Sequence, residues 1–345
     1  MDAGSVDRRR AKATTAVDDR GSSSSTTGHG GTGGRWLVLD MVRVVAAGLV
    51  FLHHLAAIGN LPLTQFAANG REGVPAFFAL SGFLVYRPFL YREIAPWPYL
   101  RRRFSRVLPA LLAAILACAL VLSGQLAWLD GVMWTLVIEL EFYALLPFIA
   151  RLSRGHELPV LGGMATLSYV GAQFAPEVDP TVAPLFGPVV FWCFAAGMLV
   201  AVAERDLPAL TGRAWLLVGI PLAVIAAWVP GVIWTDALPA IATALIIAGS
   251  LNIRAKVRWL AFAADASYPW YLWHAPLLAA IAVAYGGFGL VAFGLAGTAI
   301  AATLSVAVVE PSIRRLSGVA EGQLLSLYRL LRLGLVRVRS AVLRA

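Results

Sequence analysis

Charged residues are scarce in this 345-residue chain. They make up 14% of it, whereas 59% of its residues are hydrophobic and its mean hydropathy is +0.75. Soluble domains contain about a quarter charged residues. The composition therefore excludes an ordinary water-soluble domain and indicates that lipid is the solvent for much of the chain.

Cysteine and lysine are also rare. The two cysteines, Cys118 and Cys193, both fall inside apolar runs, which excludes a disulfide framework and indicates packing residues. Lysine occurs only at Lys12 and Lys256, so the formal charge of +9 comes mainly from arginine. The arginines stand in short clusters between apolar runs. This is typical of membrane topology signals and argues against nucleic acid as a partner.

Apolar runs of membrane-spanning length recur from Trp36 onward, taking about 20 residues as one helical crossing. We predict an all-α fold, a polytopic membrane helix bundle of about ten transmembrane helices within residues 36–315. The expected spans are 36–58, 73–92, 107–123, 131–150, 158–174, 184–203, 213–230, 233–251, 259–283 and 288–309.

The two ends of the chain differ from this bundle in composition. Residues 1–35 contain few apolar residues, which predicts a disordered cytoplasmic tail. No apolar stretch follows its basic patch directly, as a signal peptide would require. Residues 316–345 interleave Arg with Leu and Val, which predicts a basic amphipathic helix on the inner leaflet. That helix is expected either to anchor the chain or to bind a regulatory partner.

Positive charge is distributed unevenly between the expected loops. If the N-terminus is cytoplasmic, the arginine clusters all fall on the cytoplasmic side, and Arg71 is the one cation opposite them. The positive-inside rule predicts this asymmetry. We expect a multi-pass plasma or inner-membrane protein with both termini in the cytoplasm.

The first span contains four ionisable residues, and charged groups at bilayer depth are default functional candidates. Asp40 and Arg43 are three positions apart and can form a structural ion pair. Arg43 and His54 share one helix face, separated by about three turns or about 16 Å. This spacing suits a long ligand with a phosphorylated head and a reactive tail, such as acyl-CoA. A polar contact within the bundle is the alternative for His54, and no second ligand for a metal lies four residues from it.

His53 is rotated by about 100° from His54 and is expected to face a neighbour. In the second span, Ser81 and Gly82 are expected either to permit close helix packing or, for Ser81, to line a substrate path. The segment YLRRRFSRVLP carries Arg102, Arg103 and Arg106, which are expected either to anchor the chain or to bind the phosphates of CoA.

Two later segments add further candidates. Glu139 and Glu141 in the fourth span differ by about 200° of helical rotation, so only one of them can face a given site. The ninth span contains ASYPWYLWHAPL, with Tyr271, Trp273 and His274. These side chains are expected to line the substrate path or, for the aromatic residues, to form an interfacial belt.

Five segments together resemble the acyltransferase-3 family of integral membrane O-acyltransferases. They are LDMVRVVAAGLVFLHH, FFALSGFL, RRRFSRVLP, MWTLVIELEFY and SYPWYLWHAP, in the family's order and across residues 36–315. The resemblance implies that His54 is the essential histidine, Arg43 its motif partner together with Asp40, and Glu139 the aligned acid. The family's Glu-Glu-Gln run reads Glu-Leu-Glu here. We expect no esterase-like domain after the tenth span, so a separate acceptor-handling partner is one expectation.

The resemblance implies transfer of an acyl group, with acetyl expected, from acyl-CoA as co-substrate to a hydroxyl of a carbohydrate, glycolipid, macrolide or other small molecule. His54 would act as general base, with an acyl-enzyme route through His54 left open, and with no bound cofactor or metal. The alternatives are a proton-coupled transporter that uses Asp40, Arg43 and His54 as a relay, and a non-enzymatic membrane scaffold. No inverted repeat favours the transporter.

Overall fold

The computed structural model describes residues 34–61, 67, 69–120, 126–174, 187–228 and 237–312. The expected amphipathic segment 316–345 and all but the last two residues of the expected tail 1–35 lie outside the described residues. The described part forms ten α-helices, a closing π-helix, short 3-10 helices and two strands of two residues each. The helices are α1 (Leu37–Gly59), α3 (Gly73–Tyr91), α4 (Pro96–Leu120), α5 (Leu126–Leu152), α6 (Glu157–Phe174), α7 (Gly187–Asp206), α8 (Leu216–Trp228), α9 (Ala237–Ser250), α10 (Arg258–Ala282) and α11 (Gly287–Leu304), which Ser305–Val309 extends as a π-helix.

Each expected span overlaps one of these ten helices. Six helical stretches among the described residues are long and apolar enough to cross a membrane; five contain α1, α3, α4, α8 and α11, and the sixth, Val132–Leu152, lies within α5. The helix α9 is apolar but shorter. The chain is therefore a multi-pass, all-α membrane bundle, while ten crossings stay a prediction.

The third span differs from the prediction at its start. We expected an arginine-rich loop before residue 107, but α4 begins at Pro96 and the arginines form its first turns. Proline is favoured in the first turn of a helix, and arginine is a good helix former. Helical structure here has a functional consequence. Residues 102, 103 and 106 then lie within about 100° of one another around the helix, so the three arginines stand on one side of α4.

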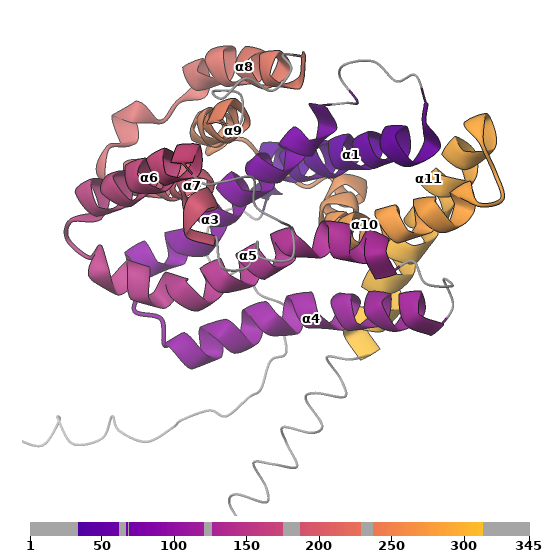
Figure 1. Ribbon diagram of the computed structural model, residues 1–345. Coiled ribbons are helices and arrows are strands. Elements are labelled where there is room, and N and C mark those ends of the chain that lie inside the picture. The colour runs from indigo at the N-terminus through magenta and orange to yellow at the C-terminus, as the bar shows by residue number, and fades with distance from the viewer. Residues whose placement is uncertain are drawn as a thin grey trace, which may run out of the picture. The chain divides into compact units, whose positions relative to one another are not determined.

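The helices that matter for the site pack closely around one another (Figure 1). The helix α3 packs along α7, and α1 packs along α10 and also contacts α3. The helices α4 and α5 lie together and both contact α10. The helices α1, α3, α5 and α10, which are distant from one another in sequence, are thus neighbours in the bundle.

Glycine permits the close approach of α3 and α7, as expected for the small residues of the second span. A Cβ atom at Gly82 would lie 2.0 Å from the carbonyl oxygen of Phe194, and one at Gly197 would lie 1.8 Å from that of Ala79. Gly82 therefore serves packing, while the neighbouring Ser81 points elsewhere, toward a cavity between the helices.

Replacing Gly82 by alanine is expected to destabilise the fold by about 1–3 kcal/mol or more, because backbone must move to admit the methyl group. Thermal unfolding of the purified protein in detergent, followed by tryptophan fluorescence, measures this as a lower Tm. Gly162→Ala in α6 is the matched control, since its Cβ atom would meet open space. An equal Tm for Gly82→Ala and wild type would contradict the close packing.

A small antiparallel pairing fixes the start of α1. Strand β1 (Arg35–Trp36) pairs with β2 (Arg254–Ala255), just before α10. The indole Nε1 of Trp36 donates to the carbonyl oxygen of Leu251 at 3.1 Å, and the Arg254 guanidinium lies 4.2 Å from the centroid of the Trp36 ring. The first turns of α1 and α10 are held side by side in this way.

Candidate active site

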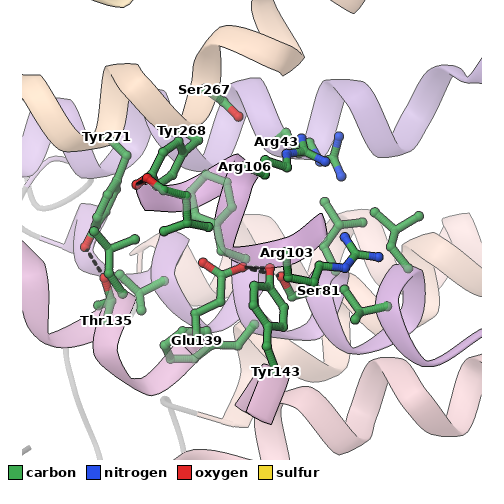
Figure 2. A pocket seen from close by; sticks show the side chains of 18 of the residues that line it. Arg43, Ser81, Arg103, Arg106, Thr135, Glu139, Tyr143, Ser267, Tyr268 and Tyr271 are labelled. Carbon is green, nitrogen blue, oxygen red and sulfur yellow. Dashed lines mark hydrogen bonds between the residues drawn. The ribbon is translucent and has the colours of Figure 1, made fainter. Parts of the chain in front are cut away.

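A cavity of about 120 Å³ lies between α1, α3, α4, α5 and α10. Six of the candidate site residues line it, and Figure 2 shows them around it: Arg43, Ser81, Arg103, Arg106, Glu139 and Tyr271. The packing therefore gathers residues from five separate motifs at one cavity.

Three arginine side chains lie at one end of this cavity (Figure 2). Arg43 comes from α1, whereas Arg103 and Arg106 come from the same face of α4. Arg102, one position away on that helix, is exposed and is not among the lining residues. Guanidinium groups bind phosphate through paired hydrogen bonds, so this end is suited to a phosphorylated ligand.

Asp40 has a closer partner than Arg43, the one that the sequence suggested. Arg35 donates to both oxygens of Asp40, at 2.9 and 3.0 Å, and also to both oxygens of Asp265. The Arg43 guanidinium lies 4.0 Å from Asp40, at the limit of an ion pair. Because Arg35 holds the Asp40 carboxylate, Arg43 is directed to the cavity.

Arg35 remains charged in this arrangement. Its hydrogen bond to Asp265 raises the pKa of the guanidinium above its ordinary value, and Asp40 adds to this, against a lowering by burial. By composition, Arg35 belonged to the expected tail, and this role was not predicted. Its position one residue before the first apolar run was the only available signal.

Glu139 is the acidic residue that lines the cavity, and Glu141 is not among the lining residues. The hydroxyl groups of Ser81 and Tyr143 both donate to Oε1 of Glu139, the first at 2.9 Å. The Arg103 guanidinium lies 5.7 Å from the centroid of the Tyr143 ring. Tyr143 was missed in the sequence analysis, although it stands four residues after Glu139 and so shares its helix face.

Tyr271 lies at the opposite end of the cavity from the arginines (Figure 2). Its hydroxyl group and that of Thr135 are 2.8 Å apart, which holds the phenol against α5. The centroids of its ring and the His274 ring are 5.6 Å apart. Tyr271 therefore connects the cavity to the histidine beyond it.

His54 meets His274, 220 residues further along the chain. Nδ1 of His54 lies 3.1 Å from Nε2 of His274 and 3.0 Å from the carbonyl oxygen of Val50. Nδ1 of His274 lies 2.5 Å from the carbonyl oxygen of Tyr271. His274 is fully buried, while His54 is partly exposed.

Some candidates lie apart from the cavity. His54 does not line it, although the sequence predicted that Arg43 and His54 face one cavity. Trp273 is also outside it and donates from Nε1 to the hydroxyl group of Ser305 at 2.9 Å. His53 packs its ring edge-on to that of His54. In the part of the chain that the structure describes, no group of three or more His, Cys, Asp or Glu residues has a geometry suited to a metal ion.

The sequence of this chain is similar to one protein family and to two characterised proteins. Residues 36–310 match the sequence model of a family described as an acyltransferase domain. The exopolysaccharide production protein ExoZ of Rhizobium meliloti (strain 1021) is 26% identical over 276 residues, covering 68% of this chain and 84% of that protein. Nodulation protein 10 of Rhizobium leguminosarum bv. viciae is 27% identical over 175 residues, covering 37% of this chain and 47% of that protein. No solved structure matches the chain.

Proposed function

The chain belongs to this acyltransferase family, and on that premise we propose that it transfers an acetyl group from acetyl-CoA to a hydroxyl group of a saccharide. The observation that carries the proposal is the cavity itself. It has three arginines at one end, and at the other Tyr271, whose ring contacts the His54–His274 pair.

The donor is proposed from the chemistry of the two ends. Arg43, Arg103 and Arg106 would bind phosphates of the nucleotide, while the flexible arm extends along the cavity toward Tyr271. Along α1, Arg43 and His54 are separated by about 16 Å, so a long donor is needed to connect them. Glu139 lies between the two ends and can accept a hydrogen bond from an amide N–H of the arm (Figure 2).

We propose that His54 is the general base. It takes the proton from the acceptor hydroxyl group, whose oxygen then attacks the thioester carbonyl carbon. The C–O bond of the ester forms, the C–S bond breaks, and the proton leaves with the thiolate as free CoA. Positioning and proton removal supply the rate. Because His54 lies outside the cavity lining, the reaction requires the Tyr271 ring to turn aside and admit the thioester.

The proposal also covers the orientation of the protein in the membrane and the acceptor of the acetyl group. With both termini in the cytoplasm, the arginine end of the cavity opens toward the compartment that contains CoA esters, in keeping with the positive-inside rule. The name of the relative ExoZ refers to exopolysaccharide production. We therefore propose a saccharide hydroxyl as acceptor, on a polysaccharide or its lipid-linked precursor.

Membranes that contain the protein are expected to move label from radiolabelled acetyl-CoA to a saccharide acceptor. The test supplies lipid-linked oligosaccharide, exopolysaccharide or a macrolide in parallel and measures labelled acceptor together with released thiol. Transfer requires both in equal amounts, and membranes without the protein are the control. Label accumulating inside sealed vesicles with no labelled acceptor would instead indicate a transporter.

A further inference from the structure

The hydrogen bonds around His274 define where its proton lies. A carbonyl oxygen can only accept, so Nδ1 of His274, at 2.5 Å from the carbonyl oxygen of Tyr271, must carry a hydrogen. The neutral ring then has its lone pair on Nε2. A second proton on Nε2 would place a cationic imidazolium in a fully buried position, which is costly.

The same reasoning fixes the tautomer of His54. Its Nδ1 faces two acceptors, Nε2 of His274 and the carbonyl oxygen of Val50. A lone pair on Nδ1 would face two further lone pairs, so Nδ1 carries the hydrogen and shares it between both acceptors. The lone pair of neutral His54 is therefore on Nε2, the nitrogen directed away from His274.

We propose that His274 is a positioning residue whose Nε2, as the second acceptor for Nδ1–H of His54, fixes the orientation of the His54 ring and so the direction of its basic Nε2. This inference rests on the proposed function, because it concerns the histidine assigned as general base. After Nε2 of His54 takes a proton, its Nδ1–H still donates to Nε2 of His274. The hydrogen bond that stabilises the His54 imidazolium is therefore formed before the reaction begins, and no side chain has to reorganise.

A second feature of the pair supports a positioning role over simple packing. The His274 ring is oriented by the backbone of its own helix, since its Nδ1 bonds to the carbonyl oxygen three residues earlier. An apolar residue would fill this buried space without requiring partners. A histidine there adds one acceptor, and that acceptor is directed at Nδ1 of His54.

Two substitutions separate positioning from packing. His274→Leu fills the space but removes the acceptor, whereas the amide oxygen of His274→Gln can take the place of Nε2. With purified full-length protein in lipid, radiolabelled acetyl-CoA and lipid-linked oligosaccharide, His274→Leu is expected to lower kcat by about 10- to 100-fold, the value of a hydrogen bond to a charged group. KM for acetyl-CoA is expected to stay unchanged, and His274→Gln is expected to restore kcat to near the wild-type value.

A control and a direct readout accompany the kinetics. Leu260→Ala truncates another buried residue of α10, about 21 Å along the helix from His274, and reports general destabilisation. NMR of protein labelled with ¹⁵N-histidine measures the chemical shift of the Nδ1-bound proton of His54, which reports the strength of its hydrogen bonds. This shift is expected to move upfield in His274→Leu, where Val50 is the remaining acceptor, and to stay near the wild-type value in His274→Gln. This readout does not depend on activity, so it tests the positioning role even if wild-type protein transfers nothing and the proposed function fails.

An unchanged chemical shift of the Nδ1-bound proton of His54 in His274→Leu would overturn the proposal. So would a loss of activity in His274→Gln as large as that in His274→Leu, because it would show that the ring and not the acceptor matters. Equal losses of kcat in His274→Leu and Leu260→Ala would likewise assign His274 to packing.

Discussion

Replacing His54 by alanine is expected to abolish acyl transfer, with a fall in kcat of about 100- to 10,000-fold, the contribution of a positioned general base. The imidazole is the group proposed to remove the proton from the acceptor hydroxyl, and its partner His274 is fully buried. Labelled acetyl transfer at saturating donor and acceptor, normalised to the amount of folded protein, measures the effect.

His53→Ala is the matched control for this experiment. The two histidines are adjacent on α1, but their side chains differ by about 100° of rotation, and His54 bonds to His274. His53→Ala is expected to keep most of the activity. Full transfer by His54→Ala at equal expression would remove the proposed mechanism, even if the family assignment stands.

Replacing Arg43 by alanine is expected to raise KM for acetyl-CoA by about 10- to 100-fold, because one charge-assisted hydrogen bond to phosphate is lost. The kcat should change much less, since Arg43 lies at the end of the cavity opposite Tyr271 (Figure 2). Initial rates over a range of acetyl-CoA concentrations measure both constants. The inhibition constant of free CoA should rise in parallel with KM, as the nucleotide end is common to both.

Two further variants sharpen the test of Arg43. Arg43→Lys keeps the charge but loses the planar pair of donors, so an intermediate KM is expected. Arg258→Ala removes an exposed arginine of α10 that does not line the cavity and should leave KM unchanged. An unchanged KM in Arg43→Ala, with a large loss of kcat, would place Arg43 at the reaction centre and not at the phosphates.

The sequence predicted the helices well because their signal is local. Each expected span overlaps one helix, since a run of about 20 apolar residues satisfies its backbone in lipid only as a helix. The error at the start of α4 has a physical cause as well. Hydropathy marks the apolar part of a helix, whereas α4 continues through the arginines to Pro96, in a segment too charged to register as a span.

The site was predictable only in part. Helix geometry separated Glu139 from Glu141, but it does not distinguish Arg102 from Arg103 and Arg106, because residues 102 and 106 are four apart and about 40° from each other around the helix. The cavity lining decides which arginines face the site. Helix geometry also placed Arg43 and His54 on one stripe of α1. Helix geometry did not predict that another side chain lies between Arg43 and His54. In the structure the cavity is lined by Arg43 at one end and Tyr271 at the other, and His54 does not line it.

The sequence by itself determined the lipid environment, the order of the helices and the face on which each polar residue stands, because all three follow from local composition and a fixed helical repeat. Only the tertiary structure decided the partners. Arg35 holds Asp40 and Asp265, Ser81 donates to Glu139, and His54 meets His274. Each of these sets joins segments from different helices. Which helix faces lie together depends on side-chain packing across the bundle, as at Gly82 and Gly197, and no local pattern in the chain encodes it.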